Sequence, residues 1–158
     1  MKVKLLGAKI SDAEVLTETQ IRTFLDDNQL KPPGCSLEGP PGYDSIEWNR
    51  KQIKSTPYYK ILYGNILVGG IIIFKTEEYQ YEVGRIWVDP AYQNLGIGQK
   101  SMAQMFGFHP EVKRWILGTP KWAFRNQHFY EKVGFIKIGE TDIDPNLGWA
   151  GIEYELER

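Results

Sequence analysis

The chain has 158 residues, 42% of them hydrophobic, which is enough for one domain that buries roughly 70% of the surface of its unfolded form. Its 19 basic and 20 acidic residues give a formal net charge of −1, which argues against a nucleic-acid-binding surface. A single cysteine, Cys35, excludes an internal disulfide, and with only two histidines beside it we expect no metal site. The first residues lack the apolar core of a signal peptide, and no apolar run is long enough to span a bilayer, so we expect a cytoplasmic protein without a membrane partner.

The first third of the chain is predicted to form one strand, two helices and a long loop. Ser11 followed by Glu14 is a capping-box pattern that opens the first helix, and Asp44 is expected to cap the second. Four prolines and three glycines between the helices predict irregular backbone. The predicted elements are a strand at 3–8, a helix at 11–27, a loop at 31–43 and a helix at 44–54.

Strands dominate the remaining two thirds. Gly64-Asn65 predicts a hairpin turn between two strands, and Gly134 is placed to end a helix as a C′ glycine. The predicted strands cover 58–63, 66–75, 82–88, 115–119, 136–142 and 151–156, and the predicted helices cover 99–106 and 122–133. This layout predicts an α+β fold with a mixed, mostly antiparallel sheet flanked by helices.

A glycine-rich turn, Gln93 to Gly98, follows the strand that ends at Val88 and precedes a helical pattern. Glycine lets the backbone approach a ligand, and the first N–H groups of a helix are unpaired donors, so the turn suits a pyrophosphate. The turn lacks the Gly-Lys-Ser/Thr of a P-loop. It also lacks the third glycine of a dinucleotide fingerprint, because Ser101 occupies that position. Both of those alternatives therefore fail.

A second motif follows about thirty residues later, in the run Asn126-Gln-His-Phe-Tyr-Glu-Lys-Val-Gly-Phe135. The order of strand, Asp-Pro, Gln-x-x-Gly-x-Gly, helix, strand and Phe-Tyr-Glu-Lys-x-Gly-Phe resembles the GNAT superfamily of acyl-CoA-dependent N-acetyltransferases. The resemblance is clear over residues 58–158 and loose over residues 1–57. It implies a single GNAT-like domain whose residues 58–158 bind acetyl-CoA and whose residues 1–57 lie mainly on the acceptor side.

The resemblance also implies a set of contacts to acetyl-CoA as co-substrate. The sequence departs from the family pattern at two places. The turn carries no Arg or Lys, and Ala123 occupies the position of a common cofactor-contacting Asn. Whether Asn126, about one helical turn later, makes that contact instead is left open. The expected cofactor-binding residues are Ile86, Trp87, Val88, Gln93, Asn94, Leu95, Gly96, Ile97, Gly98, Gln99, Lys100, Asn126 and Tyr130.

Two residues are expected to carry the proton transfers. Tyr130 matches the family tyrosine that protonates the leaving CoA thiolate, and the Val88 N–H matches the donor to the thioester carbonyl. Glu82, six residues before Val88 and so expected on the same face of the strand, resembles the glutamate that some members use as base. Its alternatives are a solvated surface role, or Glu78, Asp142 or Asp144 as the base; His109 and His128 are weaker candidates.

These residues predict transfer of an acetyl group to a primary amine by direct attack in a ternary complex, since Cys35 lies far from both motifs. The alternatives are a non-catalytic acyl-CoA-binding sensor or partner module, and a transferase of longer acyl groups. Residues 31–54 and 142–150, with Trp48 and Trp149, are expected to form the acceptor side. The acceptor is open between small-molecule amines and peptide or protein amines, and the protein is expected to be a monomer or a homodimer.

Overall fold

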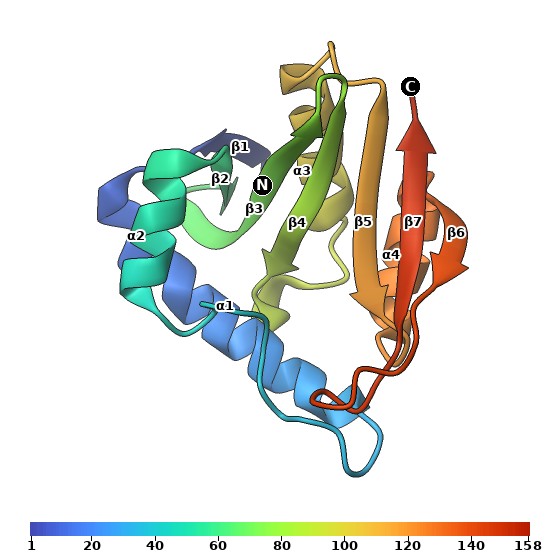
Figure 1. The fold of residues 1–158 in the computed structure, drawn as a ribbon. Coiled ribbons are helices and arrows are strands. Elements are labelled where there is room, and N and C mark those ends of the chain that lie inside the picture. The colour runs from blue at the N-terminus through green and yellow to red at the C-terminus, as the bar shows by residue number, and fades with distance from the viewer.

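A seven-stranded sheet in the order β1-β2-β3-β4-β5-β7-β6 forms the frame of the computed structural model, which describes residues 1–158 (Figure 1). All neighbouring strands are antiparallel except β4 and β5, which are parallel. The strands are β1 Val3–Gly7, β2 Tyr58–Tyr63, β3 Ile66–Glu77, β4 Gln80–Val88, β5 Arg114–Pro120, β6 Ile136–Glu140 and β7 Gly151–Glu157. The helices are α1 Ala13–Asp27, α2 Ile46–Ser55, α3 Ile97–Phe108 and α4 Phe124–Val133. The predicted α+β fold with a mixed, mostly antiparallel sheet is therefore confirmed.

The four helices are divided between the two faces of the sheet (Figure 1). Helices α3 and α4 cover the larger core, in which Trp115 of β5, Met102 of α3 and Tyr130 of α4 are buried together. Helices α1 and α2 cover a smaller cluster built on Leu16, Tyr58, Ile72 and Trp87. None of the helices is both long enough and apolar enough to cross a membrane.

The starts of the first two helices differ from the predictions. Helix α1 begins at Ala13, and the carboxylate of Asp12, rather than a Ser11 capping box, accepts a hydrogen bond from the Lys9 N–H at 2.8 Å. The same carboxylate pairs with Lys60 at 2.9 Å. Its bond to Lys9 belongs to the 3-10 turn Ile10–Asp12 that precedes α1, and α1 itself has no side-chain cap. Helix α2 is capped by Ser45, whose hydroxyl accepts from the Trp48 N–H at 3.0 Å, and not by Asp44.

A β-bulge at Gly84 reverses the side-chain alternation of β4. Val83 pairs with Ile73 and Arg85 with Ile72, which leaves Gly84 without a partner. A Cβ at Gly84 would lie 2.2 Å from the Phe74 ring, which explains why a glycine occupies the bulge. Even-numbered residues of β4 before the bulge and odd-numbered residues after it therefore point toward α1 and α2.

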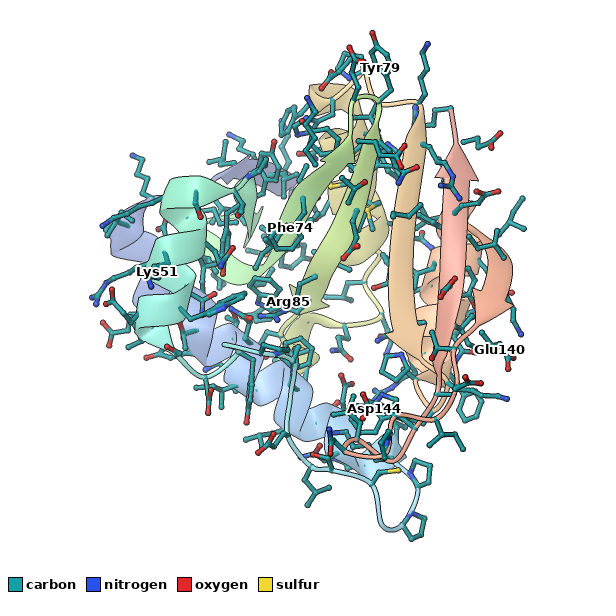
Figure 2. All side chains as sticks on the ribbon, viewed as in Figure 1. Lys51, Phe74, Tyr79, Arg85, Glu140 and Asp144 are labelled. Atoms are coloured by element: carbon teal, nitrogen blue, oxygen red, sulfur yellow. The ribbon has the colours of Figure 1, made fainter.

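Because of the bulge, the prediction that Glu82 and Val88 share one face of the strand is wrong. Glu82 lies opposite Phe74, and cross-strand partners point to the same face; Phe74 belongs to the cluster under α1 and α2. Figure 2 shows Phe74 and Arg85 on that face. Val88 instead packs against the core under α3 and α4. Glu82 and Val88 are therefore on opposite faces, because the bulge adds one residue between them.

Candidate functional site

A cavity of about 420 Å³ lies at the C-terminal end of β4, between α1, the glycine-rich turn and α4. Helix α1 supplies Thr23, Phe24 and Asp27 to its wall. Most of the predicted cofactor-binding residues also line it: Ile86, Trp87, Val88, Gln93, Asn94, Gly96, Ile97, Gly98, Gln99, Asn126 and Tyr130. Leu95 and Lys100 are exposed and lie outside the lining. The structure thus brings the two sequence motifs to one cavity.

The edge of β4 beside this cavity is unpaired. Pairing between β4 and β5 ends at Glu82 and Ile116, beyond which the two strands separate. The Asp89 N–H donates to the Val68 carbonyl at 2.7 Å, so Val88, one residue earlier, directs its N–H and C=O away from β3. The Val88 carbonyl accepts hydrogen bonds from Gln93 and Thr23. Its N–H faces the opening between the separated strands, where an amide-rich ligand would find an unpaired edge.

Helix α1 is fastened along the second half of β4. The Trp87 indole N–H donates to the Thr19 hydroxyl at 2.9 Å, and the Arg85 guanidinium donates to the Gln20 side chain at 2.9 Å. Arg22 pairs with the buried Asp89 carboxylate at 2.7 Å. These contacts hold the helix so that its last turn passes the end of β4, as Figure 1 shows. Residues of that turn line the cavity.

The glycine-rich turn leaves the N-terminus of α3 without a side-chain cap. Gly96, the N-cap residue, has φ 77°, and Asn94 has φ 64°, a left-handed conformation that Asn tolerates better than most residues. The first N–H groups of the helix, from Gly96 to Gln99, therefore have no partner within it and line the cavity. Together with the helix dipole they form a site suited to an anion.

Gly98 has a packing role that the sequence did not reveal. A Cβ at this position would lie 2.9 Å from the Phe129 ring of α4, so only glycine lets the two helices approach this closely. The absence of a side chain thus sets the distance between the glycine-rich turn and the second motif.

The cations at the cavity come from α4, not from the turn. Arg125 and Lys132 line it, and His128 lies at its exposed rim. Arg125 also forms an ion pair with Asp26 at 3.3 Å, which connects the start of α4 with the end of α1. Arg125 and Lys132 are not among the residues predicted from the sequence; their helical spacing with Asn126, Phe129 and Tyr130 was the available signal.

Tyr130 is buried and packs against Phe129, Phe135 and Tyr154. Burial raises the pKa of its phenol well above the usual range, and the nearby charge of Asp27 raises the pKa further. The phenol is therefore held in its protonated form beside the cavity. Asn126 lies one turn earlier on the same helix and also faces the cavity.

Asp27 is a cavity residue that the sequence analysis did not identify as functional. Burial raises the pKa of its carboxyl from 3.8 to about 6, against the opposing effect of the Arg125 charge. Its carboxylate has no ion-pair partner, whereas the adjacent Asp26 has one. The two aspartates are adjacent and of the same type, so the sequence does not show which of them lines the cavity. The position of the last turn of α1 in the fold decides it.

The predicted acidic candidates lie elsewhere. Glu82 is half-buried at the point where β4 and β5 separate, roughly 20 Å along the strand from Val88, and it does not line the cavity. Glu78 and Asp142 are exposed, and Asp144 accepts from the N–H groups of its own turn. His109 contacts the Tyr59 hydroxyl at 2.6 Å and packs on Trp115, which is a structural role.

The two expected acceptor-side segments lie against each other. The Ser36 N–H donates to the Leu147 carbonyl at 3.0 Å, and the Cys35 thiol lies 3.5 Å from the Gly148 carbonyl oxygen. Trp149 packs on Trp122, and both rings face the Lys31 ammonium, which is 5.1 Å from the Trp149 ring. Trp48 instead stacks under Arg85 at 4.7 Å, within the helix layer.

Solved structures share this fold. The N-acetyltransferase PaiA from Thermoplasma acidophilum, in complex with coenzyme A, superposes with a TM-score of 0.83 at 18% identity over 100% of both chains. YncA, a putative acetyltransferase from Salmonella typhimurium with acetyl-CoA, superposes at 0.68 with 12% identity over 99% of this chain and 94% of that one. A putative streptothricin acetyltransferase from Bacillus anthracis, in complex with acetyl-CoA, is 26% identical over 65% of this chain and 62% of its own, with a TM-score of 0.60.

Sequence comparison gives a more direct assignment. No curated protein matches the chain. A family model described as the acetyltransferase (GNAT) family matches residues 21–135, which include the C-terminal part of α1, the unpaired edge of β4, the glycine-rich turn and Tyr130. The chain therefore belongs to the GNAT family of acetyltransferases.

Proposed function

We propose that this protein transfers an acetyl group from acetyl-CoA to a primary amine by direct attack in a ternary complex. The observation that carries the proposal is one cavity with an uncapped helix N-terminus, an unpaired strand edge and a buried tyrosine on its walls. Solved structures with this fold contain coenzyme A or acetyl-CoA, which supports acetyl-CoA as the co-substrate.

In this proposal the cofactor lies along the walls in a definite order. The N–H groups from Gly96 to Gln99 bind the pyrophosphate, and Arg125 and Lys132 add positive charge that the turn itself lacks. The pantetheine amides pair with the free edge of β4 at Ile86 and Val88. The Val88 N–H then donates to the thioester oxygen, where negative charge develops during attack.

Tyr130 is the proposed acid. The amine attacks the thioester carbon, the carbon–sulfur bond breaks, and the departing thiolate takes the phenol proton. Burial raises the pKa of Tyr130 and so keeps that proton in place until the thiolate forms. The same burial would destabilise an adjacent thiolate and so raise the pKa of the CoA thiol as well. The raised pKa of Tyr130 therefore does not by itself prevent the proton transfer.

Direct attack is supported by the position of Cys35. This cysteine lies in the loop after α1, against Gly148, and does not line the cavity. We propose that residues 58–158 bind most of the cofactor and that residues 1–57 lie mainly on the acceptor side. Glu82 stays a proposed base, and from its position it would act only through water.

The test is a steady-state assay of CoA release with a panel of primary amines, with the acetylated products identified by mass spectrometry. Direct attack predicts intersecting initial-velocity lines and no acetylated enzyme. Tyr130→Phe keeps the ring and its packing, so CoA affinity should stay within about twofold while kcat falls roughly 10²–10⁴-fold. CoA binding without turnover on any amine would instead indicate an acyl-CoA-binding sensor.

A further inference from the structure

The last turn of α1 places an unpaired carboxylate inside the cavity. Asp27 lines the wall that also contains Tyr130, and its charge acts on that phenol. The hydrogen bonds and ion pair from Thr19, Arg22 and Thr23 to β4 fix the helix one turn earlier. The position of Asp27 is therefore set by a rigid element and not by a mobile loop.

The two cations near Asp27 are bound elsewhere. Arg125 forms its ion pair with Asp26, and the Lys31 ammonium lies over the Trp122 and Trp149 rings while it donates to the Glu38 carbonyl at 3.0 Å. A half-buried carboxylate without a counter-ion is costly for a folded protein. A ligand that brings a positive charge would satisfy it.

We propose that Asp27 binds the ammonium group of the acceptor beside Tyr130 and accepts its proton, so that the acceptor class is cationic alkylamines. The inference rests on the proposed acetyl transfer. Aromatic amines, which are uncharged near neutral pH, would gain nothing from this carboxylate.

The proton balance of the step is complete. Asp27 takes one proton from the ammonium, and the nitrogen lone pair forms the bond to the thioester carbon. The thiolate that leaves takes the proton of Tyr130, and the second proton lost by the attacking nitrogen restores the phenol. Asp27 then releases its proton to water, so one proton leaves for each ammonium consumed.

The pH profile provides a specific readout. Because the pKa of the Asp27 carboxyl is raised to about 6, kcat/KM should fall as the pH drops below that value. Other ionisable or charged groups face this carboxyl or its cavity, and His128 is the histidine among them. They are Asp26, Lys31, Arg125, His128, Tyr130 and Lys132. Asp27→Asn should remove this limb of the profile, which a limb due to His128 would survive.

The experiment compares two isomeric probes, benzylamine, which is protonated at neutral pH, and 4-methylaniline, which is not. Asp27→Asn should raise KM for benzylamine by roughly 10- to 100-fold, which is the range expected for a lost charge-assisted contact. For 4-methylaniline the change should stay within about threefold. Asp26→Asn is the matched control, since Asp26 does not line the cavity and its carboxylate already has an ion-pair partner in Arg125. Because Arg125 does line the cavity, CoA affinity is measured for each variant.

Each outcome has one meaning. If wild-type protein prefers benzylamine and only Asp27→Asn loses that preference and the acidic limb, the inference stands. If the preference is absent, or if Glu82→Gln rather than Asp27→Asn removes it, the inference is wrong while acetyl transfer remains. If the wild type binds CoA but acetylates no amine of the panel, the proposed function fails, and the inference fails with it.

Discussion

Replacing Gly96 tests whether the glycine-rich turn binds the pyrophosphate. Gly96 has φ 77°, and a Cβ there would meet no atom within 4 Å. Asn and Asp tolerate the left-handed region better than other residues, so Gly96→Asn and Gly96→Asp should both fold, each at a cost of about 1 kcal/mol. The two side chains have nearly the same shape, and their difference isolates the effect of one negative charge at the turn.

The size of that effect follows from Coulomb's law. We assume a separation of about 6 Å between a carboxylate at position 96 and a pyrophosphate with about two negative charges. The repulsion is about 1.4 kcal/mol with the dielectric constant of water and about 5.5 kcal/mol at an effective value of about 20. Because Gly96 is exposed, we expect a value toward the lower end, which corresponds to a loss in CoA affinity of roughly 10- to 100-fold for Asp relative to Asn.

Calorimetric titration with CoA measures both variants, and circular dichroism confirms that each is folded. Repeating the titration at high salt should reduce the difference, since exposed charges are screened. Wild-type CoA affinity in both folded variants would refute the phosphate assignment of this turn. A loss of affinity in both variants alike would mean that the side chain, and not its charge, blocks the site.

Three further predictions concern stability. Gly98→Ala should destabilise the fold by about 1–3 kcal/mol in urea denaturation, because its Cβ would lie 2.9 Å from Phe129, and Phe129→Leu in the same chain should recover part of this loss; no recovery would contradict the packing argument. Asn49→Ala should cost about 3 kcal/mol or more, since this buried side chain bonds Gln20, Tyr58 and Thr17 and two backbone carbonyls, and a cost below about 1 kcal/mol would be incompatible with that network. The pKa of the Asp27 carboxyl is raised in the folded state to about 6, so its contribution to stability is fully present below about pH 4 and is lost as the pH rises through 6. Asp27→Asn should therefore stabilise the free protein by roughly 1–2 kcal/mol at pH 8, after allowance for partial exposure, and by little at pH 4; equal effects at the two pH values would exclude a half-buried, unpaired carboxylate.

The sequence determined the features that depend on local backbone physics. Gly64 and Gly134 marked a hairpin and a helix end in the sequence, and each has a positive φ in the structure. The spacing of Gly96 and Gly98 before an apolar helix indicated the turn with its free N–H groups. The order of these elements was sufficient for the family and for the α+β sheet.

The helix starts show where local reasoning loses its force. Ser11 and Asp12, or Asp44 and Ser45, are equally good capping residues by type. Neither Ser11 nor Asp12 caps α1 with its side chain; the Asp12 carboxylate bonds the Lys9 N–H and the Lys60 ammonium instead. Propensity narrows such a boundary to a few residues, and tertiary contacts select among them.

Only the tertiary structure decided which acidic residue reaches the cavity. The bulge at Gly84 places Glu82 on the opposite face of the sheet from Val88, because one extra residue shifts the alternation of side chains between the two faces. Such a bulge could not be predicted from the sequence. Asp27 meets Tyr130 because α1 is fastened across β4 and its last turn extends beyond the strand end. Asp27 belongs to the first α-helix and Tyr130 to the last, so their proximity depends on long-range packing.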